Sequence, residues 1–226
     1  CHQLATQVIQ RYCTAVFYYA TIGDEWSTCA HKSDTSTCLS GDPFLSESSE
    51  CEWGGVSCEG GTVTEIAFEK NNLGGFLPPE LFALTSLKVL SLERGSISGP
   101  IPPSIGLLSN LEILDLDYNA ISGPIPPEIS QLTKLKLLDL NDNDITGSLD
   151  ALSGLSNIQF LQIHATKIGG TVPVAFGNLK RLMALTLQQT FVFGQMPETV
   201  CRLRDVYGGN LKHLESNCAG TFPSIV

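Results

Sequence analysis

The sequence predicts an α/β solenoid, a right-handed superhelix with a short parallel concave sheet and a disulfide-stapled cap at each end. Three observations predict this fold: a period of 24 residues, an apolar pattern that recurs in every period, and cysteines confined to the two ends. A fixed period of this length indicates a solenoid, because one unit cannot bury its own apolar face and must stack on its neighbours. We therefore expect function on a repeated surface.

The repeated pattern reads L-x-x-L-x-L-x-x-N-x-I-x-G-x-I-P and is clearest from Leu111 to Pro126. It predicts three parts: an N-terminal cap at 1–61, six repeats at 62–205 and a C-terminal cap at 206–226. The units begin at Val63, Leu87, Leu111, Leu135, Ile158 and Leu182. The fourth unit is one residue short and lacks the proline of the turn, so we expect a local kink or bulge there.

The N-terminal cap begins with an apolar pattern at helical spacing, which predicts an amphipathic helix over 3–20. The residues of this pattern are Leu4, Val8, Tyr12, Val16 and Tyr19. Residues 27–50 are rich in Ser, Thr, Asp and Gly, which predicts a cysteine-containing loop. The element C-x-W-G-G-V-x-C, from Cys51 to Cys58, then leads into the repeats.

The eight cysteines indicate an oxidising compartment, because six lie before residue 60, two lie after residue 200 and none lies between. Disulfides at these places would staple the segments that cover the open ends of the core. The close pairs are Cys51 with Cys58, Cys201 with Cys218, and Cys29 with Cys38. Cys1 and Cys13 cannot bridge on one helix, where twelve residues span about 18 Å. Four N-terminal cysteines allow three pairings, and these stay open.

The composition restricts the classes of binding partner that we expect. The formal net charge is -10, which argues against nucleic acid or an anionic membrane as partner. It is compatible with a cationic partner, with a metal ion, or with solubility alone. No apolar run reaches the roughly 20 residues that span a bilayer, so we expect no membrane insertion of this segment. The chain opens at Cys1 without a signal-peptide pattern, and we expect a processed mature protein or an excised piece of a longer one.

The repeat frame, the Trp53–Cys58 element and the Gly-x-Ile-Pro turns at Gly99 and Gly123 together resemble the plant-type leucine-rich-repeat family over essentially the whole chain. The stretch 19–26 and the closing segment 200–218 are most similar to diatom and related algal members. The resemblance implies a secreted protein or an ectodomain on the extracellular side of the cell surface. It also implies a recognition module that binds a protein, peptide or glycan on the concave sheet.

Within each unit a short strand should point its second and third leucine positions into the core and the residues between them outward. Strands of successive units then stack the outward residues into columns. Two features emerge on this face, an apolar stripe and an acidic cluster. The predicted ligand-binding residues are Val89, Glu93, Ile113, Asp115, Asp117, Leu137, Asp139, Asn141, Asp142, Phe160, Gln162 and His164.

The acidic cluster has two interpretations. Carboxylates stacked about 5 Å apart repel one another unless something neutralises them, which favours a site for a cationic or metal-bridged ligand. Alternatively, aspartates between the core leucines simply solvate the sheet. Calcium prefers such oxygen ligands, but the sequence holds no twelve-residue calcium loop. We therefore expect no metal and no cofactor.

Two further features concern the C-terminal units. Phe191 and Phe193 flank an inward Val192, so we expect a partner patch of two exposed aromatics; the alternative is that they pack around Tyr207. The asparagine of the pattern bonds neighbouring turns with its amide, and this position reads Asn71, Gly95, Asn119, Asn143, Thr166 and Thr190. A threonine replaces only part of an amide, so the C-terminal half of the solenoid should be looser.

We expect no enzymatic activity, because the four histidines lie in unrelated segments and form no recognisable catalytic arrangement with Ser, Cys or Asp. Two functions therefore compete. The first is a non-enzymatic extracellular recognition module, similar to a receptor or a secreted inhibitor. The second is a structural subunit of an extracellular or cell-surface assembly, which contacts other proteins through its flanks and caps.

Overall fold

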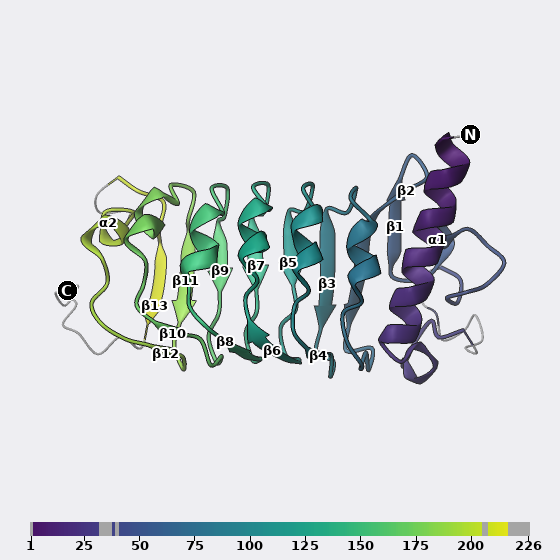
Figure 1. The fold of residues 1–226 in the computed structure, drawn as a ribbon, viewed down its shortest axis with the longest axis horizontal. Coiled ribbons are helices and arrows are strands. Elements are labelled where there is room, and N and C mark those ends of the chain that lie inside the picture. Colours follow the sequence, from purple (N-terminus) through teal and green to yellow (C-terminus); the bar gives the residue numbers. More distant parts are fainter. Residues whose placement is uncertain (1, 32–37, 39–40, 205–207, 217–226) are drawn as a thin grey trace.

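The computed structural model describes residues 2–31, 38, 41–204 and 208–216. The chain forms a leucine-rich-repeat solenoid, and helix α1 (His2–Ala20) covers its N-terminal end (Figure 1). One sheet of eight strands runs the length of the described molecule, in the order β1-β2-β3-β5-β7-β9-β11-β13. Its strands are β1 Val56–Glu59, β2 Thr62–Glu69, β3 Val89–Glu93, β5 Ile113–Asp115, β7 Leu137–Asp139, β9 Phe160–Gln162, β11 Ala184–Leu187 and β13 His213–Ser216.

The opposite side of each unit is a single 3-10 turn. These turns are η3 Pro79–Ala83, η4 Pro103–Leu107, η5 Pro127–Gln131, η6 Asp150–Gly154 and η7 Val174–Asn178, followed by the short helix α2 Glu198–Cys201. Two smaller 3-10 turns, η1 Gly23–Glu25 and η2 Glu50–Glu52, belong to the N-terminal region. Short strands lie between the main sheet and the turns: β4 Ser98–Gly99, β6 Ala120–Pro124, β8 Asp144–Thr146, β10 Gly169–Gly170 and β12 Phe191–Val192.

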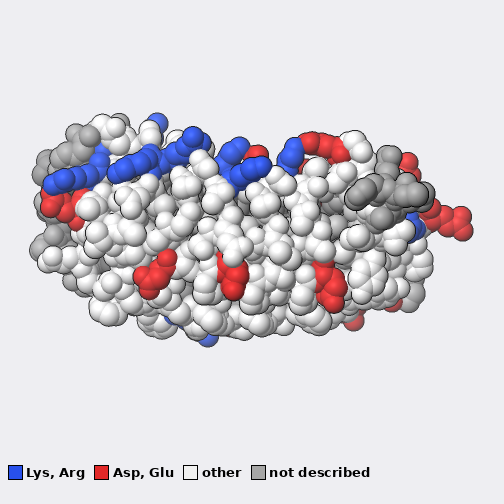
Figure 2. Space-filling view, turned by 45° about the horizontal axis from the view of Figure 1, so that its top comes forward, with Lys and Arg blue, Asp and Glu red and all other residues white. Residues whose placement is uncertain are grey.

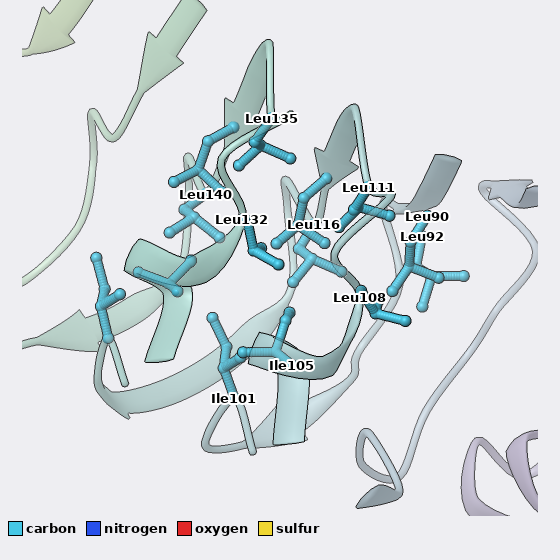
Figure 3. Close-up of a cluster of buried hydrophobic side chains, with 14 of the residues drawn as sticks. Leu90, Leu92, Ile101, Ile105, Leu108, Leu111, Leu116, Leu132, Leu135 and Leu140 are labelled. Atoms are coloured by element: carbon cyan, nitrogen blue, oxygen red, sulfur yellow. The ribbon is translucent and has the colours of Figure 1, made fainter. Parts of the chain in front are cut away.

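The core lies between the sheet and the 3-10 turns. In Figure 3, Leu90 and Leu92 of β3 and Ile105 of η4 point into the same interior. All three side chains are at most 1% exposed, as is Leu116 in the middle of the stack. The predicted register is therefore confirmed, since the second and third leucine positions of each unit are buried.

The strand pairing confirms the first two outward columns. Parallel pairs align Val89 with Ile113, Ile113 with Leu137, and Leu137 with Phe160. The same pairs align Ser91 with Asp115 and Asp115 with Asp139. β1 is the exception to the parallel order, because it pairs antiparallel with β2 and closes the N-terminal edge of the sheet.

The prediction for the apolar side of the first helix is wrong. The helix forms, from His2 to Ala20, but Val8, Tyr12 and Tyr19 are 66%, 58% and 69% exposed. The face that packs on the solenoid instead carries Cys13 and Phe17, together with Gln10, Thr14 and Tyr18. Helical spacing identified the helix, but it did not identify which side is buried.

Hydrogen bonds explain why a polar side chain lies at this interface. The Gln10 amide nitrogen donates to Glu50 Oε1 and to the Gly61 carbonyl, both at 3.2 Å, and its oxygen accepts from the Val63 N–H. Gln10 is therefore buried without an unsatisfied amide, and it joins α1 to η2 and β2. Aromatic rings fill the space beneath, with Trp26 lying between Phe44 and Phe68 at centroid distances of 4.9 and 4.7 Å.

Two of the predicted disulfides are present, Cys29–Cys38 and Cys51–Cys58. Both lie in the N-terminal cap, whose stapling is thereby confirmed. The predicted partner of Cys201, Cys218, lies outside the described residues, as does Cys1. Cys13 is buried in α1, and burial raises the pKa of its thiol.

The fourth unit differs from its neighbours where it enters its 3-10 turn. Pro102, Pro126 and Pro173 are extended before their turns, with ψ of 142°, 138° and 138°. Leu149 directly precedes the turn of the fourth unit with φ -82° and ψ -3°. The unit without the proline therefore enters its turn in a helical conformation, and the kink or bulge expected there stays a prediction.

Candidate ligand-binding surface

The outward face of the eight-stranded sheet, called the sheet face below, together with the segments that directly follow its strands, carries the twelve predicted ligand-binding residues. Its first column is half-buried at Val89, Ile113, Leu137 and Phe160. These side chains form an unbroken apolar stripe across β3, β5, β7 and β9. The stripe presents apolar surface to a ligand without exposing it fully.

The acidic cluster lies beside the stripe. Asp115 and Asp139 are neighbours across β5 and β7, and each carboxylate accepts a hydrogen bond from the N–H two residues later, at 3.2 and 3.0 Å. Asp139 is only 6% exposed and also accepts from the Gln162 amide. Short local bonds therefore hold both carboxylates in place on the sheet face.

Burial and mutual repulsion disfavour the ionised forms of this cluster. Burial, reinforced by the charges of Asp139 and Glu93, raises the pKa of Asp115 to about 7. The same causes raise the pKa of Asp117 to about 6, and burial raises that of Asp139. In the described part of the chain, none of these carboxylates forms an ion pair with Lys or Arg. An added cation would therefore interact favourably with the cluster.

The remaining predicted residues border this cluster. The Asn141 side-chain oxygen Oδ1 accepts a hydrogen bond from the backbone N–H of His164 at 2.8 Å, and Asn141 is 5% exposed. His164 Nε2 lies 3.7 Å from Asp142 Oδ2, while its Nδ1 is enclosed without a hydrogen-bond partner among the described residues. Within the described ranges, no three His, Cys, Asp or Glu side chains converge in a way that could hold a metal ion.

Sequence reasoning identified only Asp142 in a fourth column, which lies at the rim of this face. Its members all have positive φ, between 49° and 57°, and are Lys70, Arg94, Tyr118, Asp142, Ala165 and Gln189. The Arg94 guanidinium lies 5.3 Å from the centre of the Tyr118 ring, and Tyr118 is 49% exposed. The signal was available, because each member directly precedes the asparagine position of its unit. Arg94 and Tyr118 extend the candidate surface beyond the acidic cluster.

The predicted aromatic patch lies elsewhere. Phe191 and Phe193 are 69% and 62% exposed, whereas Val192 between them is 4% exposed, as the register predicts. Phe191 belongs to β12, which pairs with β10 and not with the main sheet. Tyr207, the alternative packing partner, lies outside the described residues. The patch and the sheet face are separate surfaces.

Comparison with known proteins supports a plant-type leucine-rich-repeat protein. Residues 86–145 and 109–168 match the leucine rich repeat family model. A stretch of 42 residues is 45% identical to the receptor-like kinase TMK4 of Arabidopsis thaliana, covering 19% of this chain and 4% of the kinase. None of the matches bears on the resemblance to diatom and algal members, which stays a prediction.

Two solved structures show the same fold. The ectodomain of the receptor kinase GASSHO1/SCHENGEN3 from Arabidopsis thaliana, in complex with CASPARIAN STRIP INTEGRITY FACTOR 2, is 32% identical with a TM-score of 0.65. The match covers 69% of this chain and 19% of that one. The Arabidopsis receptor kinase HAESA, in complex with the peptide hormone IDA and the co-receptor SERK1, is 24% identical with a TM-score of 0.72. That match covers 93% and 33% of the two chains. The chain thus spans only a small part of these relatives.

No helix in the described residues is long and apolar enough to cross a membrane.

Proposed function

We propose that this chain is a non-enzymatic extracellular recognition module that binds a peptide or a protein segment on the sheet face. One observation carries the proposal: the acidic cluster of Asp115, Asp117, Asp139 and Glu93 lies beside an apolar stripe and has no Lys or Arg ion pair within the described residues. A ligand with a basic side chain next to apolar ones would satisfy both features. The receptor kinase GASSHO1/SCHENGEN3, 32% identical to this chain, was solved in complex with CASPARIAN STRIP INTEGRITY FACTOR 2, which supports a ligand-binding function.

An extracellular position accords with this function. Two disulfides staple the N-terminal cap, and such bonds persist in oxidising compartments. The similar receptor kinases carry their leucine-rich repeats as ectodomains, which supports placing this chain on the extracellular side of a cell surface or in secreted form. A glycan ligand has less support, because the columns of the sheet face combine aliphatic side chains with carboxylates.

The test selects ligands without assuming their identity. A library of displayed twelve-residue peptides is panned on the immobilised chain. The affinity of each selected peptide is then measured for the parent chain and for the double variant Asp115→Asn with Asp139→Asn. We expect the selected peptides to be rich in Lys or Arg and to lose about 1–3 kcal/mol of binding free energy on the double variant. Binding should strengthen between pH 5 and 8, because a cation needs the ionised form of Asp115.

The matched control removes the same two charges elsewhere, with Glu47→Gln and Glu80→Gln, both exposed and away from the sheet face. Peptides that bind both double variants equally would place the site outside the acidic cluster. Enrichment of peptides without basic residues would remove the cationic ligand from the proposal.

A second candidate function rests on the aromatic patch. Phe191 and Phe193 expose two adjacent rings on a strand that is not part of the main sheet, which favours a contact with another protein in an assembly. Crosslinking of native material followed by mass spectrometry distinguishes the two functions. Crosslinks between copies of this chain that concentrate at the patch favour a structural subunit. Crosslinks to another molecule on the sheet face favour the recognition module.

A further inference from the structure

The two ends of the chain differ in charge, although the whole is strongly acidic. Residues 1–150 contain 7 Lys or Arg and 20 Asp or Glu, whereas residues 151–226 contain 6 and 3. Figure 2 shows where the positive charge gathers: Lys and Arg form a row along one edge of the molecule, from its middle to the C-terminal end. We call the part of this row formed by Lys134, Lys136, Lys180, Arg181 and Lys212 the basic edge.

The basic edge lies where the strands of the main sheet begin. Each residue that precedes a strand bonds its N–H to the carbonyl of the corresponding residue one unit earlier, at 2.7–2.9 Å. This ladder stacks Glu112, Lys136, Gln159, Met183 and Lys212 into one column. The Asn210 amide donates to the Lys180 carbonyl at 3.0 Å, which places Lys180 and Arg181 beside the end of that column.

Most of this positive charge is not neutralised by the residues that the structure describes. Lys136 pairs with Glu112 at 2.5 Å, but Lys134 donates only to the neutral Asn110 side chain, at 2.7 Å, and Lys180 only to a backbone carbonyl. The exposed side chains of Arg181 and Lys212 form no hydrogen bond or ion pair within the described residues. At the N-terminal end of the same edge, by contrast, Lys88 pairs with Glu59.

We propose that the basic edge binds a short acidic segment of a partner protein. The edge extends over the three strand spacings from β7 to β13, about 14 Å. An extended chain rises about 3.3 Å per residue, so four or five residues cover that length. A segment with two or three Asp or Glu residues would therefore match the uncompensated cations.

The charge of the rest of the molecule argues for a short segment over a long polyanion. A polyanion that continues along the edge beyond Lys134 meets the neutral ion pairs Lys136–Glu112 and Lys88–Glu59, and then the acidic N-terminal half. At physiological salt, repulsion between charges reaches over about 8 Å, so neighbouring parts of a long polymer would be repelled. A short segment gains the attraction at the C-terminal repeats without this opposing interaction.

The experiment measures binding of a fluorescent hexaglutamate peptide to the full chain by anisotropy at 20 and 300 mM NaCl. The test variant is Arg181→Gln with Lys212→Gln. The control variant, Lys70→Gln with Lys167→Gln, removes the same charge from residues that pair with Glu69 and Asp144 off the basic edge. We expect the test variant to bind about three- to tenfold more weakly at low salt, the control less than twofold, and parent binding to fall at high salt.

Equal losses in the two variants would show that net charge alone acts, and would overturn the proposal. Binding of polygalacturonate or heparin without binding of hexaglutamate would also overturn it, in favour of a polysaccharide. Melting temperatures of both variants check that the fold is intact. This proposal can fail independently of the proposed function, because Asp115→Asn with Asp139→Asn changes the sheet face and leaves the basic edge in place.

Discussion

The middle and the C-terminal units of the solenoid share one frame but are joined differently. In the middle, the Asn143 amide nitrogen donates to carbonyls of its own turn and, at 2.9 Å, to Leu116 of the preceding unit. Its oxygen accepts from the Ile121 N–H at 2.9 Å. Asn119 repeats this pattern with Leu92 and Ile97. Each asparagine therefore ties two units together.

Thr166, at the same position, does less. Its hydroxyl donates to the Ile163 carbonyl at 3.0 Å, a bond that closes a turn within its own unit. The Thr190 hydroxyl donates to the Leu187 carbonyl at 2.7 Å and accepts from the Val192 N–H at 3.3 Å. Since a solenoid is stabilised by each unit and by its contacts with neighbours, weaker coupling should let the C-terminal units open first. The acidic cluster thus lies mainly on the tightly joined units, and the aromatic patch on the loosely joined ones.

The largest expected effect comes from truncating the core in each region. Leu116→Ala and Leu187→Ala both remove a side chain that is 0% exposed, so each should lower the free energy of unfolding by about 2–5 kcal/mol. The location of the damage should differ. In hydrogen exchange, Leu116→Ala should loosen the units on both sides, whereas Leu187→Ala should open the C-terminal units alone. Identical exchange profiles for the two variants would contradict the proposed difference in coupling between the two regions.

Exchanging the two residue types tests the coupling directly. Asn143→Thr should lower the free energy of unfolding by about 1–3 kcal/mol, because the buried Ile121 N–H loses its acceptor. Thr166→Asn is the reciprocal variant and should slow amide exchange in the unit that precedes it, because each asparagine bonds to the preceding unit. Urea unfolding and hydrogen exchange measure the two effects. If Asn143→Thr unfolds like the parent, the side-chain ladder does not account for the difference between the regions.

Much of this organisation could be predicted from the sequence, because strand period and solenoid period both act locally. The columns through Asp115 and Asp139 followed from the period alone. The side of α1 that packs on the solenoid could not be predicted in this way. Gln10 is buried there because groups far away in the chain, on Glu50, Gly61 and Val63, satisfy its amide. The raised pKa of Asp115 likewise depends on its burial, which no single unit specifies.

The acidic cluster should partly offset the stability that the asparagine bonds give the middle units. The pKa of Asp115 is raised from 3.8 to about 7 in the folded chain, so its protonated form is favoured there. Its contribution to stability is present at low pH and is lost as the pH rises between these two values. Asp115→Asn with Asp139→Asn should therefore raise the free energy of unfolding by about 1 kcal/mol at pH 8, after allowance for solvent screening, and by less at pH 5. Urea unfolding at both pH values gives the difference, and a gain confined to pH 5 would contradict the sign.

The smallest expected effect concerns the rim column, where every unit holds a residue with positive φ. Ala165, in the loosely joined region, has φ of 51°, a conformation that costs a residue with a Cβ roughly 1 kcal/mol and glycine almost nothing. Glycine also adds freedom to the unfolded chain, which offsets about half of this gain or more. Ala165→Gly should therefore raise the free energy of unfolding by about 0–1 kcal/mol.

The control Ala120→Gly, at an exposed position in β6 without positive φ, should lower the free energy of unfolding by about 0.5–1 kcal/mol. Thermal unfolding of the two variants measures the difference in sign. If Ala165→Gly destabilises as much as Ala120→Gly, the positive φ at Ala165 does not strain the folded chain.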